Sequence, residues 1–276
     1  MIKLVVDSTC ELSIEEVEKL GIVLIPMKVT IDDDEYLVGV NLTSEAFYEK
    51  LSTCKNLPKT TQINYVEYMD AIKPIIDGGD EVLAMCLSSG ISGTFNSLRM
   101  ACEDINSPHV RCLDSQTASF AFKALVYEAL KLIERGLTLD ELEKEVERLR
   151  DKLKIFAVID NVKYLIKGGR LSLAKGMVAT ALNIKPIVTV KNKVVEMIGK
   201  AVGFSLAMKN IFKLITNVDT TKEMYYAHSN DEEKAEKFHD MILQTLGLDF
   251  KPSGSIGPII GTHVGPGCVG VAYFEK

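Results

Sequence analysis

A hydroxyl-rich turn is the segment of this sequence best suited to binding chemistry. Residues 88–97 read SSGISGTFNS, and they follow an apolar run, residues 81–87, at the point where a helical pattern begins. A strand that delivers hydroxyls and glycines to the start of a helix brings free backbone N–H groups, side-chain donors and the positive end of the helix dipole to one place. Such a turn can bind a carboxylate or a phosphate. The same residue types also form an ordinary helix N-cap, and this segment alone favours neither interpretation.

Ser92 and His263 could instead act in acyl hydrolysis. Residues 90–93 read GISG and approach the nucleophile elbow G-x-S-x-G, but the second glycine comes one residue early. A Ser/His/Asp enzyme would use Ser92, then Asp160 or Asp219, and then His263. A hydrolase of lipid esters is therefore the alternative interpretation.

Two further glycine-rich or basic segments are weaker signals. Residues 265–270, GPGCVG, match the dinucleotide fingerprint G-x-G-x-x-G, which requires a following helix. Only six residues follow up to Lys276, so we interpret the match as a turn. Residues 163–172, KYLIKGGRLS, carry three cations beside a glycine pair, which suits a solvated loop or a site for an anionic group or partner. Lys59-Thr-Thr-Gln62 supplies two hydroxyls, equally consistent with a helix cap before a pattern that starts near Asn64.

Composition excludes several classes of function. The net charge is −6 and no basic block occurs, so nucleic acid is not an expected partner. We expect a soluble, cytoplasmic protein, because the sequence shows neither a signal peptide nor 18 consecutive apolar residues. It also contains no Walker A pattern for ATP. The six cysteines form no C-x-x-C pair, and no two histidines lie at i, i+4 spacing, so we expect reduced thiols, no metal and no cofactor.

The pattern of elements predicts an α/β protein. Short apolar runs alternate with helical stretches in the first half, which is typical of a mainly parallel sheet covered by helices in three layers. The runs are 2–6, 22–29, 82–87 and 110–113, and the helical stretches are 13–20, 43–52, 66–76 and 95–105. Polar residues follow the first, third and fourth runs, at the sheet edge where open α/β folds bind ligands.

A second, α+β unit with a mixed sheet is predicted from residue 156 onward. Two helices are expected between residues 119 and 153, followed by an apolar run at 155–159. Residues 185–190 and 193–198 resemble paired strands around Lys191-Asn192. We therefore divide the chain into residues 1–155, which carry the hydroxyl-rich anion site, and residues 156–276.

Seven motifs, taken together and in this order, resemble the DegV family of bacterial fatty-acid-binding proteins. The resemblance extends from the first predicted strand to the last. Its most specific elements are S-S-x-x-S-G-T, G-G-R and G-T-H-x-G-P-G. The motifs are Asp7-Ser-Thr-Cys10, Thr60-Thr-Gln62, Ser88-Ser-Gly-Ile-Ser-Gly-Thr94, Asp114-Ser115, Tyr164-Leu-Ile-Lys-Gly-Gly-Arg-Leu-Ser172, Lys185-Pro186 and Gly261-Thr-His-Val-Gly-Pro-Gly267.

The resemblance implies a lipid carrier without catalytic residues of its own. Its expected ligand is one long-chain fatty acid, enclosed in an apolar tunnel that the second unit completes. Its expected partner is a separate fatty acid kinase subunit, which would phosphorylate the carboxyl group to acyl phosphate for phospholipid metabolism. Transient contact with a membrane is a further expectation. The ligand-binding residues implied by the family motifs are Thr60, Thr61, Ser92, Thr94, His263 and Arg170, with Arg170 near the head group or the kinase-facing surface.

Two departures from the family motifs stand out. The usual T-S-Q is Thr60-Thr61-Gln62 here, which keeps the hydroxyl. Residues 200–204, KAVGF, lack the arginine of the basic segment that often follows the hairpin of the second unit. The second departure bears on how the partner kinase is recognised.

Overall fold

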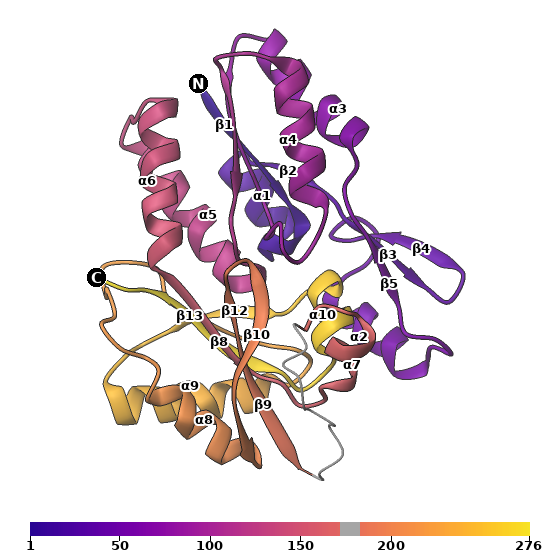
Figure 1. Cartoon of the computed structure of the whole chain (residues 1–276), viewed down its shortest axis with the longest axis vertical. Coiled ribbons are helices and arrows are strands. Elements are labelled where there is room, and N and C mark those ends of the chain that lie inside the picture. Colours follow the sequence, from indigo (N-terminus) through magenta and orange to yellow (C-terminus); the bar gives the residue numbers. More distant parts are fainter. Residues whose placement is uncertain (172–182) are drawn as a thin grey trace.

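A four-stranded parallel sheet forms the centre of the upper half of the molecule (Figure 1). The structure is a computed structural model, and it describes residues 1–171 and 183–276. The strand order is β2-β1-β6-β7, and each neighbouring pair is parallel. The expected α/β fold is confirmed. The strands are β1 (Ile2–Asp7), β2 (Val23–Ile25), β6 (Glu81–Cys86) and β7 (Val110–Asp114).

Helices cover both faces of this sheet. Its alternating side chains divide between two apolar clusters: Val5 and Ala84 pack with α3 and α4, whereas Val6 and Met85 pack with α1, α5 and α6. Figure 1 shows α3 and α4 to the right of the strands and α5 and α6 to the left. The helices are α1 (Ile14–Leu20), α3 (Tyr65–Asp77), α4 (Thr94–Ile105), α5 (Ser119–Glu134) and α6 (Leu139–Lys152).

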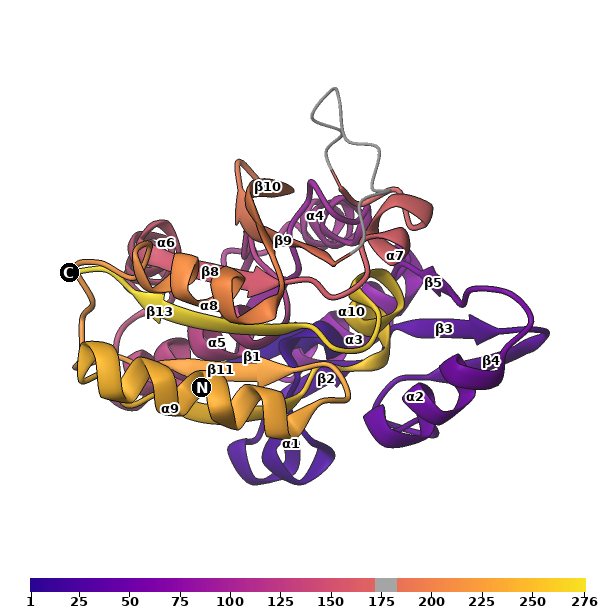
Figure 2. The ribbon, with the colours of Figure 1, turned by 90° about the horizontal axis from the view of Figure 1, so that it is seen from below.

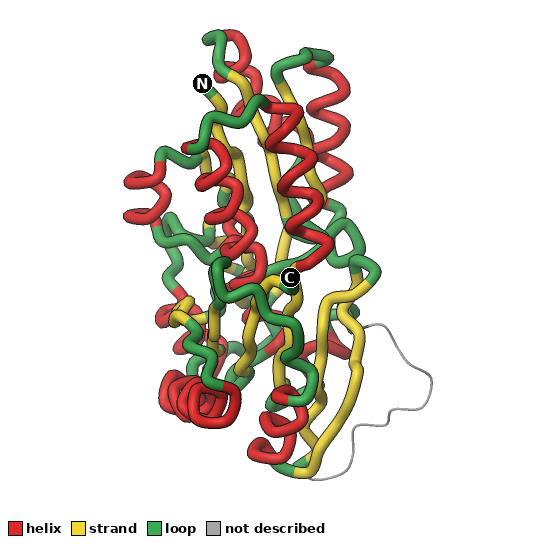
Figure 3. The backbone as a smooth tube through the Cα atoms, turned by 90° about the vertical axis from the view of Figure 1, so that its left-hand side faces the viewer, coloured by secondary structure: helices red, strands yellow, loops and turns green. Residues whose placement is uncertain are grey.

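A six-stranded mixed sheet lies below the parallel sheet along the long axis of the molecule (Figure 3). Its order is β10-β9-β8-β13-β11-β12. Helix α5 contacts β8, β11 and β13 of this sheet and shares an apolar cluster with β1 and β6 of the parallel sheet, which explains why it is apolar on most of its surface. The strands are β8 (Leu153–Val158), β9 (Ile184–Lys191), β10 (Val194–Val202), β11 (Tyr225–His228), β12 (Lys251–Ser255) and β13 (Val269–Phe274).

Helices α8 (Phe204–Phe212) and α9 (Glu232–Leu246) cover the face of the mixed sheet that points away from α5 (Figure 2). The predicted pairing of two strands around Lys191-Asn192 is confirmed, because β9 and β10 form an antiparallel hairpin there. The boundary proposed after residue 155 falls inside β8. None of the described helices is both long and apolar enough to cross a membrane.

One predicted strand is wrong in its extent. The apolar run 22–29 forms two strands in different sheets, β2 and β3 (Lys28–Ile31), with Pro26 between them. Proline has no N–H to donate to a sheet, so the run cannot continue as one central strand. Strand β3 pairs with β4 (Asp34–Leu37) and β5 (Lys59–Thr61) in a small antiparallel sheet that the sequence analysis did not predict. Helix α2 (Ser44–Thr53) lies between β4 and β5 in the chain.

The interpretation of residues 265–270 as a turn is confirmed. They connect helix α10 (Pro258–Val264) to strand β13, so a helix precedes them and a strand follows, the reverse of the dinucleotide-binding order. The turn needs glycine, because φ is +68° at Gly265 and +82° at Gly267. The Ser229 hydroxyl donates to the Gly265 carbonyl at 2.6 Å, and the Gly267 N–H donates to the Ser229 carbonyl. These bonds fix the orientation of α10 relative to the mixed sheet.

A buried aspartate fixes the carboxyl edge of the parallel sheet. Asp7, at the end of β1, accepts hydrogen bonds from the N–H groups of Leu87 and Thr9, each at 2.7 Å. Burial raises the pKa of Asp7, whereas these hydrogen bonds act in the opposite direction. The short 3-10 helix η1 (Ser8–Cys10) follows directly. The ends of β1 and β6 are therefore tied together beside the hydroxyl-rich turn.

Candidate functional site

Four segments that are distant in the sequence converge on one polar pocket. Strand β5 contributes the two threonines, the turn before α4 contributes Ser92, α10 contributes His263, and the segment after α7 (Lys163–Lys167) contributes Arg170. Of the six predicted site residues, five line this pocket. The complete lining is Met27, Thr60, Thr61, Gln62, Leu87, Ile91, Ser92, Gly93, Arg170, Ile259, Ile260 and His263.

Thr60 and His263 are in direct contact. Thr60 Oγ1 lies 3.1 Å from His263 Nε2, although 203 residues separate them in the sequence. Thr60 is half-buried, whereas the neighbouring Thr61 is exposed. Neither threonine caps α3, because Asn64 does so with its own side chain. The helix-cap interpretation of these threonines is therefore wrong, and their hydroxyls are available for the pocket.

His263 is neutral at physiological pH. Burial and, to a smaller extent, the nearby charge of Arg170 lower its pKa to about 4. Its Nδ1 atom is buried and has no hydrogen-bond partner among residues 1–171 and 183–276. A Cβ atom on Gly168 would lie 2.3 Å from Nδ1, so glycine is required where the segment after α7 passes the imidazole. The imidazole can therefore donate or accept one hydrogen bond through Nε2 toward the pocket.

His263 should make stability depend on pH. An unfolded chain protonates this imidazole below about pH 6.5, whereas the folded protein does so only near pH 4. The unfolded state binds more protons in this window, so the free energy of unfolding should fall as pH decreases from about 6.5 to 4. Urea unfolding between pH 4 and 8 should show a shallower decline for His263→Gln than for the parent. Substitution of the exposed His109 by Gln is the control. Parallel pH profiles for His263→Gln and the parent would contradict the assigned pKa.

Ser92 is positioned by Thr94 behind it. The two hydroxyl oxygens lie 2.9 Å apart, and the Thr94 N–H donates to Ser92 Oγ at 3.3 Å. Thr94 is fully buried and does not line the pocket, so we place it as a support for Ser92. The intervening Gly93 permits a close approach, because a Cβ atom there would lie 2.2 Å from Gln62 Oε1. Gln62 is a lining residue that the sequence analysis named only as part of a motif.

Arg170 is exposed and stands at the rim. Its Nη1 atom donates to the Gly168 carbonyl at 2.5 Å, which holds the guanidinium near His263. Lys163 and Lys167 lie in α7, so the first part of the predicted basic loop is helical. Ser172, the last residue of that motif, lies outside the described residues.

A second, apolar pocket opens from the first. Its cavity volume is about 80 Å³. Its walls come from the start of α5, from β8, β9 and β10, and from α10. It shares Ile91, Arg170, Ile260 and His263 with the polar pocket. The remaining wall residues are Ala118, Ser119, Phe120, Ile155, Ala157, Ile159, Leu165, Val188, Thr189, Val190, Val195, Ile256, Val264 and Cys268.

The two pockets together have the form of a site for an amphipathic anion. Sequence motifs indicated most of the polar end, but no pattern in the sequence indicated the apolar residues of the wall. Apolar residues in strands and helices look the same in sequence whether they face a cavity or a filled core. Residues 155–159 read as an apolar run, and nothing in it distinguishes Ile155 and Ala157 as cavity residues.

The sequence profile of the family described as "Uncharacterised protein, DegV family" matches residues 1–276. The chain belongs to the DegV family. A DegV domain-containing protein of Staphylococcus aureus (strain MRSA252) is 30% identical over 276 residues, covering 99% of this chain and 98% of that protein.

Solved DegV structures share the fold over the full length. A DegV family protein from Thermus thermophilus, described as binding fatty acid, is 27% identical with a TM-score of 0.89, and covers 100% of this chain and 99% of that one. DegV from Bacillus subtilis, described as a fatty acid binding protein, is 29% identical with a TM-score of 0.86 and the same coverage.

In this DegV protein the groups of a hydrolytic triad do not meet. His263 contacts Thr60, and its other ring nitrogen has no carboxylate partner in the part of the chain that the structure describes. Asp160 Oδ1 lies 2.8 Å from Lys185 Nζ, and Asp219 accepts from the hydroxyl and N–H of Thr221. Without an oriented base, Ser92 has no means of activation. The hydrolase alternative therefore finds no support in the site.

Metal binding was not expected from the sequence. Across residues 1–171 and 183–276, no group of three or more His, Cys, Asp or Glu side chains is arranged to hold a metal ion.

Proposed function

We propose that this protein binds one long-chain fatty acid, with the carboxyl group in the polar pocket and the acyl chain in the apolar pocket. The observation that carries the proposal is the junction of the two pockets at Ile91, Arg170, Ile260 and His263. The descriptions of the Thermus thermophilus and Bacillus subtilis proteins as fatty acid binding support it. Residues 1–155 would supply most of the polar end, and residues 156–276 would complete the apolar tunnel.

The magnitudes are consistent with tight binding. Burial of an acyl chain of roughly 15 methylenes is worth on the order of 10 kcal/mol before the costs of ordering. A buried carboxylate without partners would cost several kcal/mol, so the head group must be satisfied. The Thr60 and Ser92 hydroxyls can donate to it, and the Arg170 guanidinium supplies a charge of opposite sign at the rim.

Denaturing extraction of the purified protein, followed by lipid mass spectrometry, tests the proposal directly. We expect about one fatty acid per chain, because a ligand this deeply enclosed should survive purification. Delipidated protein should take up octadecanoic acid and should not hydrolyse acyl esters. Absence of both retained lipid and uptake would refute the assignment.

We further propose that the protein presents the bound carboxyl group to a separate fatty acid kinase. The polar pocket is lined by Arg170, which is an exposed cation on a short turn. Its guanidinium can contact the phosphoryl group that the kinase transfers, and this supports the proposal. Catalysis then resides in the partner, and this chain acts as its lipid-binding subunit.

Arg170→Ala should impair phosphorylation more than folding. Exposed substitutions usually change stability by about 0.5 kcal/mol or less, so the melting temperature should hardly move. Acyl phosphate formation with a bacterial fatty acid kinase subunit and ATP should slow by roughly tenfold or more, with partial recovery in Arg170→Lys. Arg135→Ala, which changes an exposed arginine after α5, is the control. A normal phosphorylation rate in Arg170→Ala would remove Arg170 from the proposed role.

A further inference from the structure

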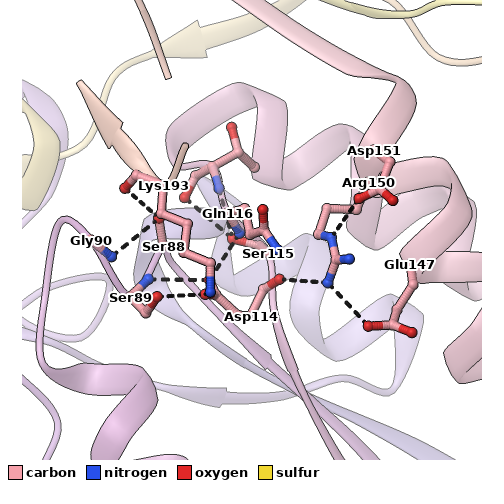
Figure 4. A network of polar contacts seen from close by, with 11 residues as sticks. Ser88, Ser89, Gly90, Asp114, Ser115, Gln116, Glu147, Arg150, Asp151 and Lys193 are labelled. Carbon is pink, nitrogen blue, oxygen red and sulfur yellow. Dashed lines mark hydrogen bonds and ion pairs between the residues drawn. The ribbon is translucent and has the colours of Figure 1, made fainter. Parts of the chain in front are cut away.

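The tip of the β9–β10 hairpin lies against the turn that begins at Ser88, as the contact of Ser88 with Lys193 shows (Figure 4). Ser88 Oγ donates to the backbone carbonyl of Lys193 at 2.7 Å, although 105 residues separate them. The Lys193 ammonium lies 3.1 Å from Asp114 Oδ2, at the end of β7. One residue of the hairpin therefore contacts two strand ends of the parallel sheet.

Ser88 links this contact to the pocket. Its carbonyl accepts hydrogen bonds from the N–H groups of Ile91 and Ser92, at 3.0 and 3.1 Å. Both of these residues line the polar pocket. Ser88 itself is completely buried. The Ser88 carbonyl thus positions the backbone that carries the Ser92 hydroxyl, and the Lys193 carbonyl in turn positions the Ser88 side chain.

Asp114 gives the turn a second support. It is buried, and it accepts hydrogen bonds from the N–H of Ser89 at 3.1 Å and from the Ser89 hydroxyl at 2.6 Å. Figure 4 shows Ser89 and Lys193 converging on this carboxylate. A buried carboxylate needs a charged or hydrogen-bonding partner, and Lys193 supplies the cation.

Gly90 is the point of closest approach. A Cβ atom at this position would lie 2.4 Å from the Lys193 carbonyl oxygen. The φ angle of Gly90 is not positive, so its backbone would accept alanine. Position 90 therefore requires glycine because a side chain would clash with the hairpin, and not because of the conformation of the turn.

The same hairpin forms part of the wall of the apolar pocket. Val188 and Val190 of β9 and Val195 of β10 line that pocket. A ligand that fills the apolar pocket therefore contacts the strands whose tip supports the head-group turn.

We propose that Lys193, at the tip of the β9–β10 hairpin, is a positioning residue for carboxylate binding: it holds the Ser88–Ser92 turn in its binding geometry through Ser88 and Asp114. The inference rests on the proposed function. It predicts that displacement of the hairpin tip weakens recognition of the carboxyl group specifically, and leaves burial of the acyl chain largely unchanged.

Gly90→Ala tests the contact, with Gly199→Ala as the matched control. A Cβ atom on Gly199, in the same hairpin, would make only an ordinary contact of 3.6 Å with Ile187. Delipidated variants are titrated with octadecanoic acid and with octadecanol, which lacks the carboxylate. For Gly90→Ala we expect about tenfold weaker binding of the acid and a change of no more than about twofold for the alcohol. Gly199→Ala should match the parent with both ligands.

Lys193→Met provides a second test that does not depend on tolerance of a new side chain in the turn. It keeps the backbone carbonyl and the stem but removes the ammonium, and the acid should bind about threefold to tenfold more weakly. Lys193→Arg should restore binding. Lys191→Met, at an exposed position of the same hairpin, is the control. Melting temperatures establish that each variant is folded.

The outcomes separate the two proposals. If the parent protein binds no octadecanoic acid, the proposed function fails. If the parent binds it, but Gly90→Ala and Lys193→Met leave the acid unaffected or weaken acid and alcohol equally, the positioning role of Lys193 is wrong.

Discussion

Removal of both pocket hydroxyls should weaken binding of octadecanoic acid by at least about 30-fold. In Thr60→Val with Ser92→Ala, the buried carboxylate loses two donors, and a hydrogen bond to a charged group is worth about 1.5–3 kcal/mol. Both positions line the polar pocket, and the Thr60 hydroxyl also lies within hydrogen-bond distance of His263 Nε2. The loss should appear as a faster dissociation rate and a higher Kd in displacement titrations of a fluorescent fatty acid.

The exposed Ser52, in α2, supplies the control for this experiment. Ser52→Ala removes a hydroxyl far from the pocket lining and should bind the acid like the parent. Each single variant should give an intermediate loss. Parental affinity in the double variant would show that the carboxyl group does not lie between these hydroxyls.

A larger side chain at position 157 should displace a few methylenes of the acyl chain from the apolar pocket. Ala157 lies in β8, is almost fully buried and lines the apolar pocket. Leucine there adds about three carbon atoms and should displace a similar number of methylenes. At about 0.8 kcal/mol per methylene, binding of octadecanoic acid should weaken by roughly 50-fold in Ala157→Leu, measured by titration of delipidated protein.

Val158→Ile is the matched control for the cavity variant. Val158 is the next residue of β8 and faces the opposite side, where it packs in the cluster formed with α8 and α9. Overpacking at this position can lower stability by about 1–3 kcal/mol, but it should not change affinity for the ligand. Equal affinity in Ala157→Leu and the parent would place the acyl chain elsewhere.

Local patterns in the sequence were sufficient to predict most of the elements. Apolar runs bounded by polar turns located β1, β6 and β7, and helical periodicity located α1, α3 and α6, each of which begins with a capping box in the structure. These signals work because helix caps and strand alternation involve residues that are close in the chain. The run 22–29 was wrongly predicted as one strand, because the single proline at position 26 outweighs the six apolar residues around it.

The polar end of the site was also accessible from the sequence. Hydroxyl and glycine residues at strand ends identified the turn around Ser92, and family resemblance added Thr60, His263 and Arg170. The role of Thr94 was less visible, because its hydroxyl points to Ser92 and not to the pocket. Residue type reveals that a group can bind an anion, but it does not reveal the direction in which the side chain points.

The sequence by itself determined the α/β class, the order of the elements and the types of residue available to bind an anion. Only the tertiary structure decided that Thr60 meets His263, that an apolar cavity lies behind them, and that Lys193 supports the turn before α4. These contacts join residues more than 100 positions apart. They depend on how α10 and the β9–β10 hairpin pack against the first sheets, and such packing leaves no local pattern in the chain.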